Sequence, residues 1–428
     1  MKKKIFLIGL NLYSIFLAIN IRSKSKNFDI TILEGSNNFL QAFKPIKIAK
    51  YFINPGFHAF ENIRSKSLLI FLKKIIKLRK LNKTRGIIID NHLISYQDKY
   101  SNWPEEIIKK FKLKKNKLVY SKITEADFAD KIYIKYIKKN VSDNRMSLDS
   151  AFDFSYPWFF PPNYQIASKD EAALFNQKVR EKKIKHSYIF PSGGLFENIS
   201  KNLRELMNKK NIKIKLNTQI KFFKKKNQLY FDGLSELNIK KNIKIICVPV
   251  KPLSASINDN KLKKIKKLNP IKYFTGLVEI KNFVKSDLDK FSEIIVASKY
   301  ALGLKRISLY SDIFDVEKKK IYQIEFLEHS KCKDLTKQIN DILLFMTKFV
   351  KFKNSKNKNI NLIGYYFVRN IFGPKKDELK FITKKTNIFF KKKKNIFFPR
   401  SILWPINSNK HFTYAKKDYN NIIQHKLQ

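Results

Sequence analysis

The sequence is poor in the residues that build disulfide frameworks and metal sites. It has 2 cysteines and 6 histidines in 428 residues. Cys247 lies inside an apolar run at 243–249 that predicts a buried strand, and Cys332 belongs to no cysteine pattern. The histidines are scattered, and none is spaced as a metal-binding pair. This composition excludes a disulfide-stabilised fold and a zinc-type site, so we predict that no metal is bound.

Acidic residues, glycine and proline are also scarce. The chain has 35 Asp and Glu against 89 Lys and Arg, which gives a formal net charge of +54, and it has only 11 Gly and 13 Pro. The basic excess is almost all lysine, spread along the chain together with abundant Ile, Asn, Phe and Tyr. These are residues of A/T-rich codons, so a compositional bias explains the charge. Because nucleic-acid sites favour arginine, we predict a solvated lysine surface and no specific nucleic-acid partner.

The N-terminal apolar run, residues 5–19, is too short to cross a membrane comfortably. Lysines precede it, as in a secretory signal peptide, yet no small-x-small cleavage site follows at Ala18-Ile19-Asn20. A strand, a turn and a helix explain the same residues and also the acid at Glu34. We therefore favour a folded N-terminus and a cytoplasmic protein, with a signal peptide as the alternative.

The first 34 residues have the layout of a βαβ unit. Residues 4–9 form a short apolar run, 12–25 have apolar residues at helical spacing, and 28–34 form a second apolar run that ends in Glu34. In dinucleotide-binding units the helix N-terminus faces a diphosphate and the acid binds a ribose hydroxyl. The spacing from the turn to the acid therefore favours a nucleotide site.

The turn keeps only part of the glycine fingerprint G-x-G-x-x-G. Gly9 is present, Asn11 stands at the second position and Ser14 at the third. Ser14 is a mild change because its side chain is small. Asn11 is a larger change, because glycine at that position lets the backbone approach the phosphates, although an amide can donate a hydrogen bond to an anion.

Two further segments bear on the surface and on the pocket. Residues 67–82 predict a basic amphipathic helix, which either docks on its own domain or makes a peripheral contact with an anionic membrane. Residues 152–162 are dense in aromatics and proline, which favours a packed loop. That loop lines a pocket in one interpretation and plugs a domain boundary in the other.

Two motifs in the middle of the chain carry a family resemblance. Residues 191–203 (PSGGLFENISKNL) and 211–220 (NIKIKLNTQI) resemble the P-x-G-G helix and the strand after it in the flavin-dependent amine oxidase superfamily. That group includes protoporphyrinogen oxidases, phytoene desaturases and, more distantly, UDP-galactopyranose mutases. The order of the βαβ unit, a G-x-H segment, the P-x-G-G helix and a strand ending at 246–249 also matches. The resemblance covers residues 1–60 and 185–255.

The resemblance implies that FAD is the cofactor. It implies that Gly9, Asn11 and Ser14 approach the diphosphate, that Glu34 binds the ribose and that the backbone of Ile220 holds the adenine. It also places Gly56 and His58 in the G-x-H segment near the flavin ring. His58 is the candidate for a catalytic role beside the flavin, and a purely structural histidine is an equal alternative.

The sequence also departs from the family. Residues 38–41 (NFLQ) replace an arginine and a glycine pair that wrap the phosphates in relatives, and no C-terminal flavin motif is recognisable. These departures leave open whether FAD is retained.

The predicted fold is α/β, with a Rossmann-like FAD-binding domain built on a parallel sheet. An inserted substrate domain combines a mixed or antiparallel sheet with helices. We assign residues 1–90, 185–255 and 400–428 to the first domain, and residues 91–184 and 256–399 to the second.

The predicted function is an FAD-dependent oxidoreductase that takes a hydride from a small-molecule substrate. A flavin-dependent sugar-nucleotide mutase and a non-catalytic nucleotide-binding relative are the alternatives. The oligomeric state is left open.

Overall fold

The computed structural model spans the chain and describes a defined subset of its residues. These are 3–40, 43–55, 60–61, 66–81, 84–95, 104–110, 188–218, 221–225, 228–232, 243–247, 271–298, 300–301, 303–314, 320–329, 331–332, 334–354, 359–371, 396–397, 415–416 and 418–420. The expected helices at 125–139 and 169–182 and the aromatic loop at 152–162 lie outside the described residues.

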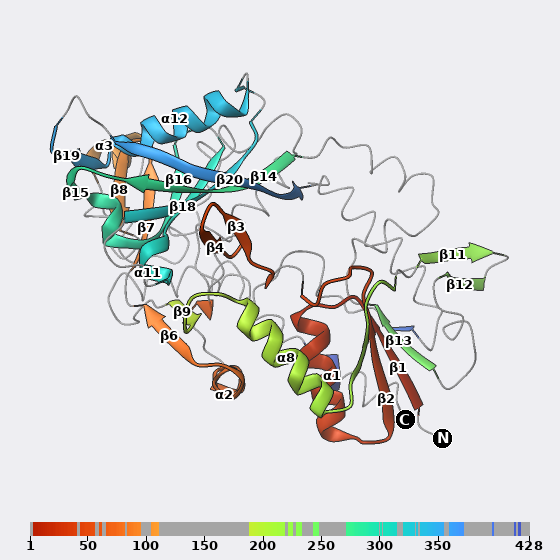
Figure 1. The fold of residues 1–428 in the computed structure, drawn as a ribbon. Coiled ribbons are helices and arrows are strands. Elements are labelled where there is room, and N and C mark those ends of the chain that lie inside the picture. The colour runs from red at the N-terminus through yellow and green to blue at the C-terminus, as the bar shows by residue number, and fades with distance from the viewer. Residues whose placement is uncertain are drawn as a thin grey trace.

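A five-stranded parallel sheet gathers segments from distant parts of the chain (Figure 1). Its order is β10-β2-β1-β13-β21, and every neighbouring pair is parallel. The strands are β1 (Lys3–Ile8), β2 (Phe28–Leu33), β10 (Lys213–Lys215), β13 (Ile243–Cys247) and β21 (Ile396–Phe397). Chain order therefore runs outward from β1 through β2 to β10, and then restarts on the other side with β13. Such a reversal is where ligands bind in doubly wound sheets.

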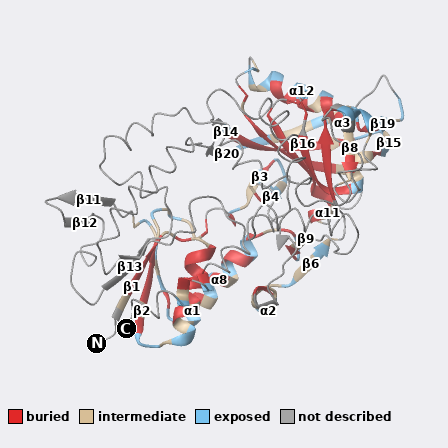
Figure 2. Ribbon diagram, turned by 180° about the vertical axis from the view of Figure 1, so that it is seen from behind, coloured by how far each residue is buried: buried red, intermediate tan, exposed pale blue. Residues whose placement is uncertain are grey.

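Three helices pack in layers beside this sheet. Helix α1 (Leu12–Lys24) packs on β1 and β2, α8 (Glu197–Lys209) packs on α1, and α2 (Lys66–Ile75) packs on α8. Helix α1 is buried along most of its length, whereas α8 has one buried and one exposed side (Figure 2). A helix that is covered on all sides is apolar all round, which explains why its sequence also resembles a signal peptide.

A seven-stranded mixed sheet forms the core of the second region. Its order is β20-β14-β18-β17-β16-β7-β8, and only the β16–β7 pair is parallel. The strands are β7 (Thr84–Ile89), β8 (His92–Ser95), β14 (Ile271–Ile280), β16 (Phe291–Ala297), β17 (Leu304–Leu309), β18 (Lys320–Leu327) and β20 (Ile360–Ile371). Helix α12 (Leu335–Thr347) starts at the side-chain cap Asp334 and covers one face of this sheet (Figure 1).

Smaller elements connect and edge the two sheets. The two-stranded pairs are β3 (Ile46–Ile48) with β4 (Tyr51–Ile53), β11 (Lys221–Lys225) with β12 (Gln228–Asp232), and β15 (Phe283–Ser286) with β19 (Val350–Phe352). A three-stranded sheet consists of β5 (Phe60–Glu61), β9 (Tyr188–Pro191) and β6 (Leu78–Leu81). The short helices are α3 (Glu105–Lys110), α11 (Tyr310–Phe314) and η7 (Asp287–Lys290). The described part of the chain contains no helix of the length and apolarity that a membrane crossing requires.

Most predicted elements are present, and the α/β class with one parallel and one mixed sheet is confirmed. The apolar run 5–19 is divided between β1 and α1 and is not a single helix. The helix predicted for 67–82 was wrong in its second half, because it ends at Ile75 and residues 78–81 form β6. Pairing with β9, more than a hundred residues away, overrides the helical periodicity there.

The domain boundaries stay a prediction. Two strands, however, pair with the sheet of the domain to which they were not assigned. Strand β7, at 84–89, joins the mixed sheet through β16 and β8. Strand β21, at 396–397, joins the parallel sheet through β13.

Candidate functional site

The turn between β1 and α1 lies at the carboxyl end of the parallel strands. Gly9 has φ 98°, a left-handed conformation that glycine adopts without strain, and its N–H donates to the carbonyl of Leu33 at 2.8 Å. The remaining fingerprint glycine is therefore required by the turn itself. It also ties the end of β1 to the end of β2.

Asn11 and Ser14 form a reciprocal cap on α1. The Asn11 Oδ1 atom accepts from the N–H of Ser14 at 3.0 Å, and the Ser14 Oγ atom accepts from the N–H of Asn11 at 2.9 Å. The N–H groups of Leu12 and Tyr13 have no acceptor among the described residues. The helix therefore satisfies part of its own N-terminus and leaves two backbone donors open.

The Glu34 carboxylate is held between the turn and the loop that follows β2. Its Oε2 atom accepts from the N–H of Leu10 at 2.7 Å, and its Oε1 atom accepts from the N–H of Ser36 at 2.9 Å. Its backbone is fixed by β10, because the Glu34 N–H donates to the Lys215 carbonyl and the Glu34 carbonyl accepts from Thr218. Each carboxylate oxygen keeps a further lone pair. The group can therefore accept from a ligand hydroxyl without giving up either bond.

Together these residues can hold two kinds of ligand group. An anion at the start of α1 meets the backbone donors of Leu12 and Tyr13 and the positive end of the helix dipole. A hydroxyl group beside it meets the oriented carboxylate of Glu34. The start of α1 and the Glu34 carboxylate together suit a phosphate next to a sugar. They offer fewer backbone donors than a full glycine fingerprint does.

The end of the chain also contacts this unit. The hydroxyl of Tyr13 donates to Asp418 Oδ2 at 2.8 Å in a buried setting. Burial, with the neighbouring Asp418 carboxylate, raises the pKa of Tyr13 well above its usual value, so the phenol stays protonated. No local pattern in the sequence indicates this contact, since 405 residues separate its partners.

Three of the predicted site residues, Gly56, His58 and Ile220, lie outside the described residues. Asn54, two residues before Gly56, in contrast has a defined place. It directly follows β4 and is 3% exposed. No pattern in the sequence singles it out.

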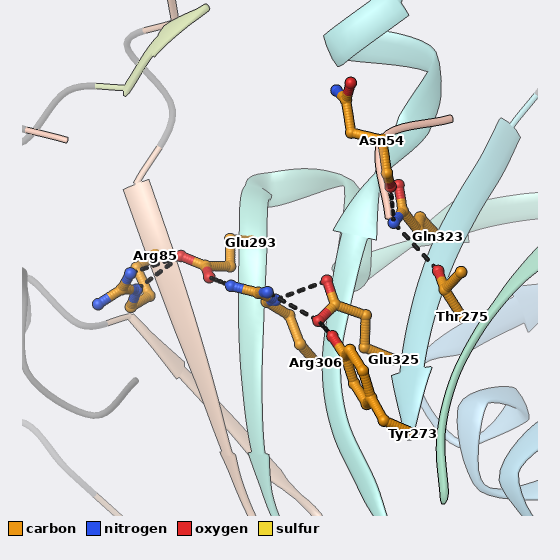
Figure 3. Close-up of polar contacts among 8 residues, drawn as sticks. All are labelled: Asn54, Arg85, Tyr273, Thr275, Glu293, Arg306, Gln323 and Glu325. Carbon is orange, nitrogen blue, oxygen red and sulfur yellow. Dashed lines mark hydrogen bonds and ion pairs between the residues drawn. The ribbon is translucent and has the colours of Figure 1, made fainter. Parts of the chain in front are cut away.

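Asn54 joins three parts of the molecule, and Figure 3 shows its contact with Gln323 of the mixed sheet. Its Nδ2 atom donates to the Gly194 carbonyl at 2.9 Å, and its Oδ1 atom accepts from the Phe196 N–H at 3.0 Å. Its carbonyl accepts from Gln323 Nε2 at 3.1 Å, and the same nitrogen lies 3.1 Å from Thr275 Oγ1. The segment that leads into the predicted G-x-H motif is thus fixed to both the PSGG turn and the mixed sheet.

The PSGG turn requires glycine because of its left-handed backbone and, at Gly194, because a side chain has no space. Gly193 and Gly194 have φ values of 83° and 81°. A β-carbon on Gly194 would lie 2.7 Å from Phe314 Cδ1 and 2.9 Å from the Ile313 carbonyl oxygen. The motif therefore fits tightly against α11 from the other region.

A row of buried charges crosses the mixed sheet on the face opposite α12 (Figure 3). Arg85 Nη2 lies 2.7 Å from Glu293 Oε2, and Arg306 Nη1 lies 2.9 Å from Glu293 Oε1. Arg306 also binds Glu325 through Nη2 at 2.7 Å and Nε at 3.0 Å, and Tyr273 donates to the same carboxylate. The row alternates positive and negative groups and carries no net charge.

Strand alternation explains how these charges are separated from the apolar core. Ile294, Ile307 and Ile324 pack under α12, and the residue next to each of them along its strand belongs to the charged row. Burial by itself would lower the pKa of Arg306, but Glu325 and Glu293 outweigh it and raise that pKa, so the guanidinium stays charged.

The charged row was not predicted. No arginine cluster is recognisable around Arg306 in the sequence, but in the structure all three of its guanidinium nitrogens bind carboxylates. The available signal was a charged residue inside each of several apolar strands, as in FSEIIVA and KIYQIEFL. Because its guanidinium is buried and each nitrogen already binds a glutamate, Arg306 is not placed to bind a diphosphate.

Solved structures with the same arrangement cover almost the whole chain. A reduced UDP-galactopyranose mutase matches with a TM-score of 0.66 and 12% identity, over 100% of this chain and 97% of its own. A candidate protoporphyrinogen oxidase from Exiguobacterium sp. 255-15 matches with a TM-score of 0.56 and 11% identity, over 99% of both chains. The chain has the fold of flavoprotein amine oxidase-like enzymes.

The amine oxidase-like fold is also shared with a variant of putrescine oxidase, with a TM-score of 0.55 and 10% identity over 99% of both chains. No family model and no curated protein matches the sequence. At such low identity the likeness shows the fold, and the reaction has to be argued from the residues of this chain.

Proposed function

We propose that this chain binds FAD and acts as an FAD-dependent oxidoreductase on a small-molecule substrate in the cytoplasm. The observation that carries the proposal is the Glu34 carboxylate, fixed by the N–H groups of Leu10 and Ser36 beside the open start of α1. In this proposal Glu34 accepts a hydrogen bond from the ribose, and the start of α1 beside it binds the phosphate. When bound, FAD supplies hydride acceptance from a C–H or C–N bond.

The residues of the turn divide the binding work among them. Gly9 gives the chain its left-handed turn, Ser14 fills the small space between helix and strand, and Glu34 orients the ribose. Asn11 occupies the Ser14 N–H with its Oδ1 atom, which leaves its Nδ2 atom to donate to a phosphate oxygen. In this proposal the amide replaces part of what a glycine backbone offers in relatives.

The roles of the remaining site residues follow from the resemblance. Gly56 and His58 would lie near the flavin ring, Ile220 would hold the adenine through its backbone, and residues 152–160 would exclude water. The support for the first two is indirect. Asn54 fixes the chain at the point from which the G-x-H segment continues.

Visible absorbance tests the cofactor directly. Purified protein, incubated with FAD and desalted, should carry flavin bands near stoichiometric amounts. Glu34→Gln loses the charge and keeps only one of the two acceptor oxygens that hold the turn, so FAD affinity should fall at least ten- to a hundredfold, roughly the value of one charged hydrogen bond. Glu205→Gln, on the exposed side of α8, is the matched control. Protein that stays colourless with saturating FAD would contradict the proposal.

A sugar-nucleotide mutase is the second candidate, because the mutase structure matches with a TM-score of 0.66 against 0.56 and 0.55 for the two oxidases. A mutase needs reduced flavin yet consumes no electrons. Assays with UDP-galactopyranose under dithionite, followed by chromatography of the product, separate the two reactions. The buried ion pairs of Arg306 with two glutamates weigh against this candidate, since they hold an arginine that could otherwise bind the diphosphate.

A non-catalytic nucleotide-binding relative is the third candidate, and the reciprocal cap of Asn11 and Ser14 favours it. Asn11→Gly removes the cap and restores the fingerprint glycine. If that substitution creates flavin binding where the natural chain has none, the natural turn is a repurposed scaffold.

A further inference from the structure

A groove separates the C-terminal end of α2 from the start of α8. Its volume is about 510 Å³, and it is open to solvent. One wall belongs to the segment at the end of α2 and the other to the PSGG turn and α8; the lining residues are Lys73, Lys74, Ile75, Ile76, Lys77, Ser192, Asn198, Lys201 and Asn202. None of these residues belongs to the nucleotide turn at Gly9.

The groove concentrates positive charge without a counter-charge. Four of its nine lining residues are lysines and none is acidic. Among the described residues, none of these four lysines forms an ion pair. Four unpaired ammonium groups around one concave surface favour a multivalent anion.

Backbone donors add to the lysines. Helix α8 is 13 residues long, and its N-cap residue Phe196 provides no side-chain cap, unlike the N-cap residues of α1 and α12. The N–H groups of Glu197 and Asn198 have no acceptor among the described residues, and Asn198 lines the groove. The positive end of α8 therefore opens on the same surface as the lysines.

The walls of the groove are fixed without a ligand. Asn202 donates its side-chain N–H to the Ile75 carbonyl, and the Ser192 N–H donates to the Lys77 carbonyl at 2.8 Å. Leu72 of α2 and Leu203 of α8 are buried in the same core. A ligand would therefore meet preformed walls and pay little ordering entropy in the backbone.

We infer that this groove binds a phosphate-bearing anion. A phosphate group presents several charged oxygens to the lysines and to the start of the helix. The side chains of Ile75 and Ile76 offer an apolar strip to the group that carries the phosphate. The phosphate comes either from a soluble ester or from an anionic lipid, and Ile70 on α2, 45% exposed, would contact the lipid.

Lysine acetylation read by mass spectrometry locates the site on the full-length chain. Millimolar pyrophosphate should slow acetylation of Lys77 and Lys201 at least fivefold. Lys285 and Lys351, which face each other on the separate β15–β19 pair, should change less than twofold (Figure 1). Equal protection of all four lysines, or protection of none, would overturn the inference. The readout is site-resolved and does not depend on whether FAD binds at Gly9.

Matched charge variants test affinity. Lys77→Gln combined with Lys201→Gln should weaken pyrophosphate binding in titration calorimetry at least tenfold. Lys285→Gln combined with Lys351→Gln removes the same charge and should change it less than twofold. Equal losses in the two double variants would mean that the general lysine surface binds the anion, and the groove would be rejected.

Vesicles separate the two sources of phosphate. Vesicles of phosphatidylcholine with phosphatidylglycerol should retain the protein if the ligand is a lipid, and Ile70→Ser and the groove double variant should both release it. If the ligand is soluble, Ile70→Ser and the groove double variant leave vesicle retention unchanged, and Ile70→Ser leaves pyrophosphate affinity unchanged. Absence of both vesicle and pyrophosphate binding would overturn the inference.

Discussion

The two sheets place their polar side chains differently and satisfy them with different partners. In the parallel sheet the polar contacts lie at the strand ends, where Gly9, Asn11, Ser14 and Glu34 bind backbone groups close to them in the turn. In the mixed sheet a row of charged side chains crosses neighbouring strands inside the protein. The first arrangement leaves donors open to a ligand. The second satisfies its charges internally and fixes the strands in register.

The largest expected effect comes from breaking the charged row. Arg306→Met leaves Glu325 buried without a guanidinium partner and Glu293 with Arg85 alone, so the free energy of unfolding should fall by about 3–5 kcal/mol. Urea unfolding followed by tryptophan fluorescence measures it. Arg204→Met on the exposed side of α8 is the control, and combining Arg306→Met with Glu325→Gln should recover part of the loss. A loss below about 1 kcal/mol would mean that the row stabilises little.

Asn54→Ala should have the next largest effect. It leaves the Gly194 carbonyl and the Phe196 N–H without partners, at roughly 1–3 kcal/mol for each group. Asn54→Asp keeps the acceptor for Phe196 but sets a buried carboxylate oxygen against the Gly194 carbonyl, so it should lose at least as much as the alanine variant. Thermal unfolding of the three proteins gives the order. Equal stability of the wild-type protein and the alanine variant would contradict the role of Asn54 as a joint.

A substitution at Lys305 should have the opposite effect, because this buried side chain has no partner among the residues that the structure describes. Lys305 lies where β17 shifts register against β18, is 2% exposed, and its Nζ atom makes no hydrogen bond within that described part. Burial lowers the pKa of Lys305 well below its ordinary value of 10.5. Lys305→Met should therefore raise the free energy of unfolding by about 1–3 kcal/mol.

The pH dependence of Lys305 has a defined sign. Between its lowered pKa and 10.5 the unfolded chain binds a proton that the folded chain does not, so this residue makes stability rise with pH. The difference between Lys305→Met and the natural chain should shrink as the pH rises toward 10.5. Unfolding curves at several pH values measure it, with Lys285→Met as the exposed control. A constant difference would show that Lys305 keeps its proton in the fold.

The smallest effect on stability concerns the cap of α1. Asn11→Gly should change the free energy of unfolding by only a few tenths of a kcal/mol, whereas Asn11→Ala should cost about 1 kcal/mol, because alanine neither caps nor tolerates the turn as well. The same glycine should tighten FAD binding, measured by fluorescence quenching, and the alanine should not. If FAD binds less tightly to Asn11→Gly, the Nδ2 atom of Asn11 is the more important phosphate donor.

The sequence predicted the first region well because its signals are local. Short apolar runs marked β1 and β2, and the spacing from the turn to the acid after β2 marked the nucleotide site. The PSGG motif was recognisable because its turn has a left-handed backbone, which glycine adopts without strain. Whether FAD occupies the turn, and what His58 does, stay predictions.

The sequence could not predict what depends on distant pairing. Residues 78–81 have helical spacing but form a strand because β9 lies beside them. Arg85 and Glu293 are 208 residues apart, and no local sequence pattern at either residue indicates that they pair.

Sequence alone determined the α/β class, the βαβ unit with its single fingerprint glycine, and the resemblance to a flavin-binding superfamily. Those features follow from residue periodicity and from backbone conformations that only certain residues adopt. Tertiary structure alone decided that Glu34 binds the Leu10 N–H, that Asn54 joins the two regions, and that the arginines face glutamates. Such contacts depend on which strands become neighbours, and that choice is made by the packing of the whole core.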